Sequence, residues 1–107
     1  MISFMNRLIQ EHWTELEELC QRYHVRRLEL FGSATGARFD RNRSDLDFLV
    51  EFEELESGQY AETYFGLLED LEALFQRPID LVMVSAIKNP YFLEAIASSR
   101  MVLYDAA

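Results

Sequence analysis

The feature that most constrains the fold of this chain is an alternating segment at residues 45–52, which reads Asp-Leu-Asp-Phe-Leu-Val-Glu-Phe. In a β-strand, successive side chains point to opposite faces of the sheet. One face of this segment is therefore wholly apolar, with Leu46, Phe48, Val50 and Phe52, and the other holds Asp45, Asp47, Leu49 and Glu51. The segment is predicted to be a strand whose apolar face lies against a hydrophobic core.

Helices are predicted on both sides of this strand in the sequence. Residues 4–23 and about 59–75 carry apolar side chains at three- and four-residue steps, as amphipathic helices do. A third helix is expected at about 90–99, because Pro90 suits a first helical turn. Strands are predicted at 25–31 and 79–84, and a closing strand is a candidate at 101–104. Residues 33–44 are expected to form a loop, with room for one helical turn. This order predicts an α/β (α+β) fold in which helices flank a small mixed sheet.

Composition limits the size and the partners of the protein. The chain has 107 residues, half of them hydrophobic, which fits a single domain over residues 1–107. Its formal net charge of −9 opposes binding to nucleic acids, which depends on Lys and Arg. The single cysteine, Cys20, fits a reducing compartment, and no signal peptide or membrane-spanning run is recognisable. We therefore expect a cytoplasmic protein that contacts neither membranes nor nucleic acid.

Acidic side chains on the polar face of the 45–52 strand indicate a metal site. Asp45 and Asp47 are two residues apart, so they project from one face with their Cα atoms roughly 6.5–7 Å apart. Such a pair favours a cation between its members, and Mg²⁺ binds through one or two carboxylates together with substrate phosphates. Asp80 begins another predicted strand. If that strand lies beside the first, three carboxylates converge, as two-metal phosphoryl transfer requires.

The segment before the loop supplies a candidate phosphate site. The predicted strand at residues 25–31 ends at Gly32, and Ser33 follows. A glycine at this point lets backbone N–H groups approach a phosphate closely, and the Ser33 hydroxyl is placed to donate to a β- or γ-phosphate. The phosphate site and the carboxylates are therefore separated by one loop.

Gly32-Ser33, a gap of eleven residues, and then Asp45-Leu46-Asp47 within an apolar strand resembles the signature of the DNA-polymerase-beta-like nucleotidyltransferase superfamily. The short chain and the sequences around these motifs are most similar to its minimal nucleotidyltransferase (MNT) branch, over residues 28–84. The resemblance implies the polymerase-beta-like nucleotidyltransferase fold and ATP as the nucleoside triphosphate. It also implies roles for five residues: Asp45 and Asp47 hold two Mg²⁺ ions, Asp80 is the third carboxylate and activates the acceptor hydroxyl, and Gly32 and Ser33 bind the triphosphate.

The sequence departs from the family in the loop. The gap is one residue longer than the ten residues often found in MNT antitoxins, and Thr35-Gly36 stands where many relatives have Arg-Gly. Three arginines of this loop, Arg38, Arg41 and Arg43, are candidates to neutralise the triphosphate in its place. The alternative is that they form an exposed loop that offsets nearby acidic residues.

The resemblance also implies a partner. Stand-alone MNT proteins are commonly the antitoxins of HEPN-domain ribonuclease toxins, and some adenylylate a tyrosine of the toxin. The chain is thus predicted to be a Mg²⁺-dependent enzyme that transfers AMP from ATP to a protein hydroxyl, within a HEPN/MNT toxin–antitoxin pair. Two alternatives stay open. One is a non-catalytic binding module that neutralises its partner by contact, and the other is a transferase that acts on a small molecule.

Overall fold

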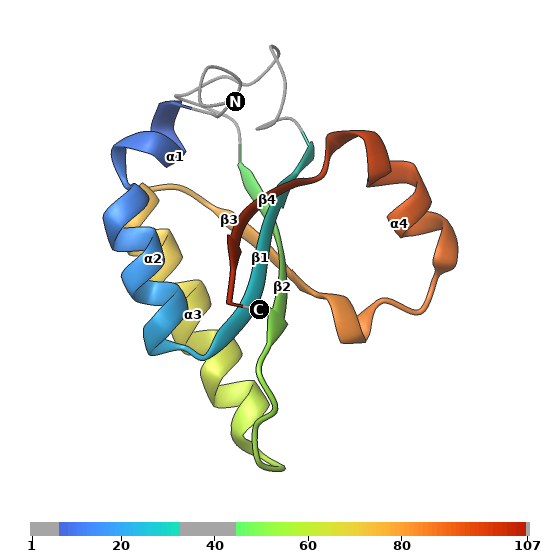
Figure 1. Ribbon diagram of the computed structural model, residues 1–107, viewed down its shortest axis with the longest axis horizontal. Coiled ribbons are helices and arrows are strands. Elements are labelled where there is room, and N and C mark those ends of the chain that lie inside the picture. Colours follow the sequence, from blue (N-terminus) through green and yellow to red (C-terminus); the bar gives the residue numbers. More distant parts are fainter. Residues whose placement is uncertain (1–6, 33–44, 107) are drawn as a thin grey trace.

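The computed structural model, which describes residues 7–32 and 45–106, is built around a four-stranded mixed sheet (Figure 1). The strands are β1 (Val25–Phe31), β2 (Leu46–Phe52), β3 (Ile79–Met83) and β4 (Met101–Asp105), in the spatial order β3-β2-β1-β4. β1 is antiparallel to both β2 and β4, whereas β2 and β3 are parallel. The predicted mixed sheet, including the closing strand near the C-terminus, is therefore confirmed.

Three helices cover one face of the sheet: α1 (Arg7–Glu11), α2 (Trp13–Arg22) and α3 (Gln59–Phe75). The prediction of one continuous helix over residues 4–23 is wrong at His12, where the chain leaves the helix. There the His12 N–H donates to the Ile9 carbonyl, and the imidazole ring packs edge-on against Phe75 of α3 with centroids 5.4 Å apart. This tertiary contact lies outside what the helical spacing can reveal. In the described part of the chain, no helix is long and apolar enough to cross a membrane.

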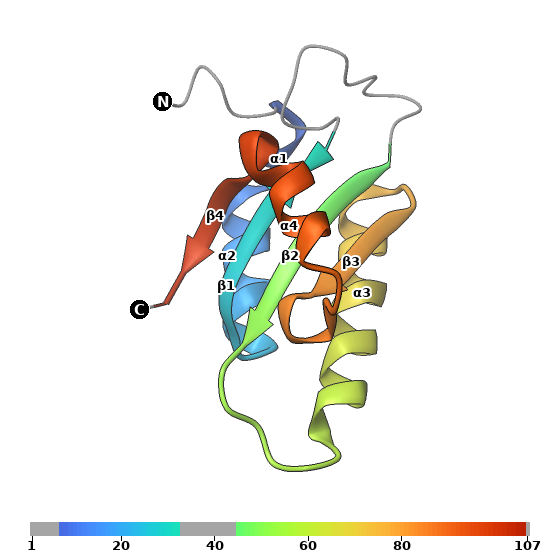
Figure 2. The same cartoon turned by 90° about the vertical axis from the view of Figure 1, so that its right-hand side faces the viewer.

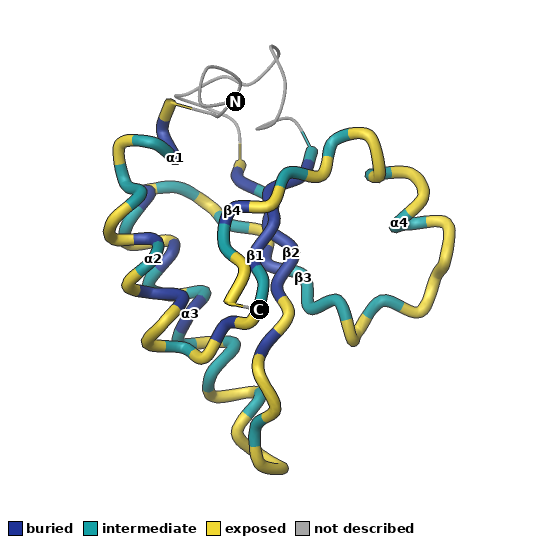
Figure 3. The backbone as a smooth tube through the Cα atoms, in the orientation of Figure 1, coloured by how far each residue is buried: buried dark blue, intermediate teal, exposed yellow. Residues whose placement is uncertain are grey.

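The hydrophobic core lies between the sheet and the faces of α2 and α3 turned toward it (Figure 3). From the sheet, Leu28, Leu30 and Phe48 are fully buried, and from the helices Leu67 and Leu71 meet them. Burying side chains of this kind stabilises a fold by roughly 1.5–3 kcal/mol each before entropic costs. The apolar face predicted for residues 45–52 is thus the core face of β2.

The opposite side of the sheet carries α4 (Pro90–Ile96), with the short 3₁₀ turns η3 (Val84–Ala86) before it and η4 (Ala97–Ser99) after it (Figures 1 and 2). Pro90 occupies the first turn as predicted, and the Asn89 side chain caps the helix by accepting the Tyr91 N–H at 2.9 Å. None of the α4 residues is buried. Because the core helices lie on the other side, the C-terminal segment lies on the side of the sheet that carries the candidate carboxylates.

Candidate active site

The parallel pairing of β2 and β3 brings two of the predicted carboxylates together. Asp47 and Asp80 are direct partners in the register, and their strands begin beside each other with Leu46 opposite Ile79. Registered partners share a face of the sheet, and neighbouring strands lie about 4.8 Å apart. Asp45 immediately precedes β2, and it is close enough for its negative charge to act on Asp47. The strand that contains Asp80 therefore lies beside β2, as the predicted convergence of the carboxylates requires.

The electrostatics of this face favour a cation. The pKa of the Asp47 carboxyl is raised, first by desolvation and then by the negative charges of Asp80 and Asp45. Asp47 is half-buried, whereas Asp45 and Asp80 are exposed to solvent. A divalent cation would relieve this repulsion. The donor set therefore fits Mg²⁺, which binds oxygen ligands and keeps positions open for phosphate and water.

The carboxylates do not by themselves complete a metal cage. Within residues 7–32 and 45–106, no group of three or more His, Cys, Asp or Glu side chains is arranged to hold a metal ion. Mg²⁺ sites that serve phosphoryl transfer are normally built from one or two carboxylates and completed by substrate phosphates. The arrangement of Asp47 and Asp80 matches this kind of site, in which nucleotide and metal bind together.

Gly32 lies directly against the Asp47 carboxylate, because β1 and β2 are neighbours and Phe31 is the register partner of Asp47. Its φ of +76° is in the left-handed region, and a Cβ atom at this position would lie 2.5 Å from Asp47 Oδ2. The left-handed conformation favours glycine here, and a side chain at this position would displace the Asp47 carboxylate. The candidate phosphate turn and the candidate metal carboxylate are thus adjacent. Ser33 lies outside the described residues, as do the three loop arginines Arg38, Arg41 and Arg43.

Sequence reasoning missed the residues that support this turn. The Gly32 N–H donates to Ser99 Oγ at 3.2 Å, which ties the turn to η4. Beside it, Arg100 forms a two-pronged ion pair with Glu29 of β1, at 3.0 and 2.7 Å. Glu29 is only 3% exposed. The one available signal was a carboxylate among the apolar residues at the end of the strand, Leu28, Leu30 and Phe31, since a buried carboxylate needs a charged partner.

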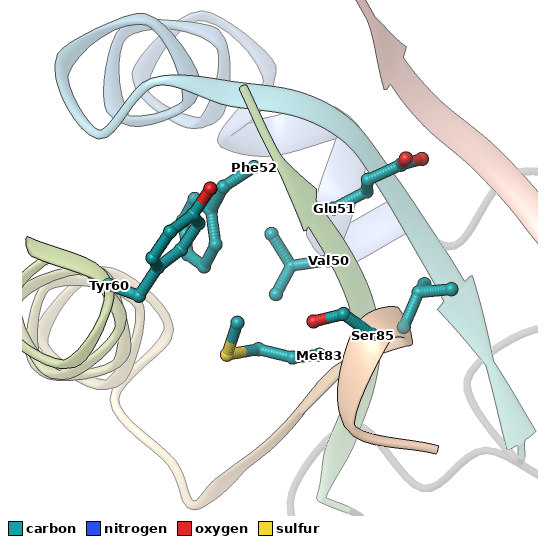
Figure 4. Close-up of a pocket in the computed structure, with 7 residues that line it drawn as sticks. Val50, Glu51, Phe52, Tyr60, Met83 and Ser85 are labelled. Atoms are coloured by element: carbon teal, nitrogen blue, oxygen red, sulfur yellow. The ribbon is translucent and has the colours of Figure 1, made fainter. Parts of the chain in front are cut away.

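Two hollows of the described surface lie away from the carboxylate pair. Figure 4 shows one of ≈ 370 Å³, into which Val50, Tyr60 and Met83 point while Glu51 points away. Its β2 residues are at the opposite end of the strand from Asp47. Another, of ≈ 490 Å³, runs along α3 and β3. Tyr64, one of its lining residues, donates its hydroxyl to the Leu81 carbonyl at 2.6 Å. Asp45 and Asp80 themselves are exposed to solvent where β2 and β3 begin.

Comparisons with known proteins agree with this geometry. The family model of the nucleotidyltransferase domain matches residues 14–103. A curated relative, the protein adenylyltransferase MntA of Thermococcus cleftensis, is 40% identical over 73 residues, which cover 68% of this chain and 70% of that protein. The strands that position the candidate site residues, β1, β2 and β3, all lie within the matched region.

Solved structures share the fold. A candidate minimal nucleotidyltransferase superposes with a TM-score of 0.68 at 27% identity and covers 91% of this chain and 94% of its own. The complex of a tri-AMPylated Shewanella oneidensis HEPN toxin with its MNT antitoxin contains a chain similar in fold, with a TM-score of 0.63 at 16% identity. That match covers 91% of this chain and 72% of the other. The fold and the resemblance predicted from the sequence are confirmed, and the chain belongs to the nucleotidyltransferase domain family of enzymes.

Proposed function

We propose that the protein is a Mg²⁺-dependent adenylyltransferase that moves AMP from ATP to a hydroxyl side chain of a partner protein, and that this partner is a HEPN-domain toxin. The observation that carries the proposal is the placement of Gly32 against Asp47 and of Asp47 beside Asp80. The candidate phosphate turn and two carboxylates meet there at the end of one sheet. The similarity to a protein adenylyltransferase and to an antitoxin in complex with an AMPylated HEPN toxin supports this acceptor and this partner.

In the proposed reaction, the acceptor oxygen attacks the α-phosphorus of ATP, the bond to the bridging oxygen of pyrophosphate breaks, and the hydroxyl proton passes to Asp80. The products are an AMP ester of the partner and pyrophosphate. Asp45, Asp47 and Asp80 would hold up to two Mg²⁺ ions, which supply positive charge at the phosphates when bound. The protein contributes by positioning the reactants and by binding the triphosphate at Gly32 and Ser33.

Two features favour a protein as the acceptor. Asp45 and Asp80 are exposed at the sheet's end, as access for a bulky acceptor requires, and both hollows described above lie elsewhere along β2, β3 and α3. A net charge of −9 disfavours RNA or DNA and suits a partner with a neutral or basic docking surface.

The position of the label in ATP tests the reaction. ATP labelled at the α-phosphate should transfer label to the purified HEPN partner, whereas ATP labelled at the γ-phosphate should leave the partner unlabelled. Transfer should stop when EDTA removes Mg²⁺. Label arriving from the γ-phosphate would show a kinase reaction, and label arriving equally well in EDTA would exclude the metal-dependent mechanism.

A further inference from the structure

Three side-chain contacts join the C-terminal segment to the end of β1. We call these three contacts the β1 tether. Phe92 of α4 packs edge-on against Phe31, with ring centroids 5.8 Å apart and planes at 84°. Ser99 accepts the Gly32 N–H, and Arg100 pairs with Glu29. Figures 1 and 2 both place this segment on the face of the sheet away from α2 and α3. The three contacts converge on the strand end that leads into the candidate phosphate turn.

Ser99 occupies the central position in the tether. Its hydroxyl accepts from Gly32 at 3.2 Å and donates to the Ile96 carbonyl at 3.0 Å. The bond to Ile96 orients the hydroxyl, so that an oxygen lone pair faces the Gly32 amide. The ion pair of Arg100 with the buried Glu29 fixes the backbone immediately next to it. Ser99 is therefore held from two sides.

Gly32 needs such support because glycine has few conformational restraints of its own. Its left-handed backbone lies so close to Asp47 that a Cβ atom would meet Oδ2. A rotation of the Gly32 peptide would therefore change both the direction of the turn and the space beside the carboxylate. In enzyme active sites a misplacement of about 1 Å can cost about 100-fold in rate.

We infer that Ser99 is a positioning residue for nucleotide binding: its hydroxyl holds the Gly32 turn in the orientation that receives the triphosphate beside Asp47. The inference rests on the proposed function, since it assigns a role to Gly32 in binding MgATP. Ser99 acts through Gly32 and makes no contact with the reacting atoms itself. The substrate it serves is a nucleoside triphosphate complexed with a divalent cation.

The test compares three variants by MgATP affinity, by transfer kinetics and by melting temperature. Ser99→Ala removes the hydroxyl, Ser99→Thr keeps it, and Ser98→Ala removes an exposed hydroxyl from the same 3₁₀ turn as a matched control. Ser99→Ala should weaken MgATP binding about tenfold, as the loss of one hydrogen bond can do, and should lower kcat as well. Ser99→Thr should recover most of the affinity, and Ser98→Ala should match the unmodified protein.

The inference fails if Ser99→Ala binds MgATP as tightly as the unmodified protein, or if Ser99→Thr is as weak as Ser99→Ala. It also fails if the affinity loss of each variant merely follows its loss of melting temperature, since a purely structural role would give that result. The affinity measurement needs no acceptor. If the unmodified protein binds MgATP without transferring AMP, the proposed function fails, and the Ser99 inference is decided by the affinities alone.

Discussion

At the scale of single residues, Asp47 is the position on which the site depends. It lies beside Asp80 in the register, feels the negative charge of Asp45, and has its carboxylate where a Cβ atom at position 32 would lie. Periodicity alone predicts that Asp45 and Asp47 share a face, because that follows from the alternation of a strand. The contact between Gly32 and Asp47 could not be predicted in the same way, since it depends on how β1 and β2 are aligned.

Replacing Gly32 by Ala should lower the free energy of unfolding by more than the strain of an alanine in a left-handed conformation would. Gly58→Ala is the matched control, because Gly58 also has a left-handed φ, of +91°, but a Cβ atom added there would have none of the described residues within 4 Å. Gly58→Ala should lower the free energy of unfolding by roughly 1–2 kcal/mol. Gly32→Ala should lower it further in urea titrations and should also abolish the stabilisation by MgATP. Equal losses in the two variants, with MgATP binding retained in both, would contradict the contact with Asp47.

The raised pKa of Asp47 predicts a pH-dependent stability of the protein without metal. The folded protein keeps a proton on this carboxyl at pH values where the unfolded chain has released it, so the stability falls as pH rises from the ordinary value of 3.8 through the raised pKa. Asp47→Asn removes this loss and should raise the melting temperature at neutral pH, with no gain below the ordinary pKa. Thermal melts in EDTA across this range measure the effect. If Asp47→Asn is less stable than the unmodified protein at neutral pH, the raised pKa of Asp47 is contradicted.

At the scale of elements, the contacts that join the C-terminal segment to β1 are the part of the architecture that the sequence did not reveal. Ser99 and Gly32 are 67 residues apart, and Arg100 and Glu29 are 71 apart. No local pattern links residues at such distances, whereas the helical and strand spacings that were predicted correctly are local. His12 shows the same limit: the apolar spacing continues through it, yet the helix is interrupted there and its ring packs against the distant Phe75.

The ion pair between Glu29 and Arg100 should stabilise the junction of β1 with β4. Arg100→Met leaves the Glu29 carboxylate, which is almost fully buried, with Arg27 at 3.5 Å as a remaining partner, and the expected loss is about 2 kcal/mol. The double variant Glu29→Leu with Arg100→Met removes both charges and should recover more than half of that loss, as apolar replacements of buried pairs often do. Urea unfolding of the two variants measures this difference. A single variant within about 0.5 kcal/mol of the unmodified protein would mean that the pair contributes little.

At the scale of the whole molecule, the two faces of the sheet differ in what they contact. One face buries the core against α2 and α3, and the other presents the carboxylates and is crossed by the weakly buried α4. Asp45 and Asp80 are exposed, and the protein carries a net charge of −9. A partner protein that brings its own docking surface and its acceptor hydroxyl fits this arrangement. The alternative from the sequence, neutralisation of the partner by contact alone, makes a different prediction about the partner's covalent state.

The most direct measurement is the intact mass of the HEPN partner after incubation with this protein, ATP and Mg²⁺. The unmodified protein should add one or more AMP units, and Asp47→Asn should reduce the rate of addition by at least about 100-fold, the loss typical when a key electrostatic group is removed. Glu51→Gln is the matched control, because Glu51 is an exposed carboxylate on the same face of β2, and it should leave the rate unchanged. If the partner is neutralised at unchanged mass, and equally well by Asp47→Asn, the protein acts by contact and the enzymatic account is wrong.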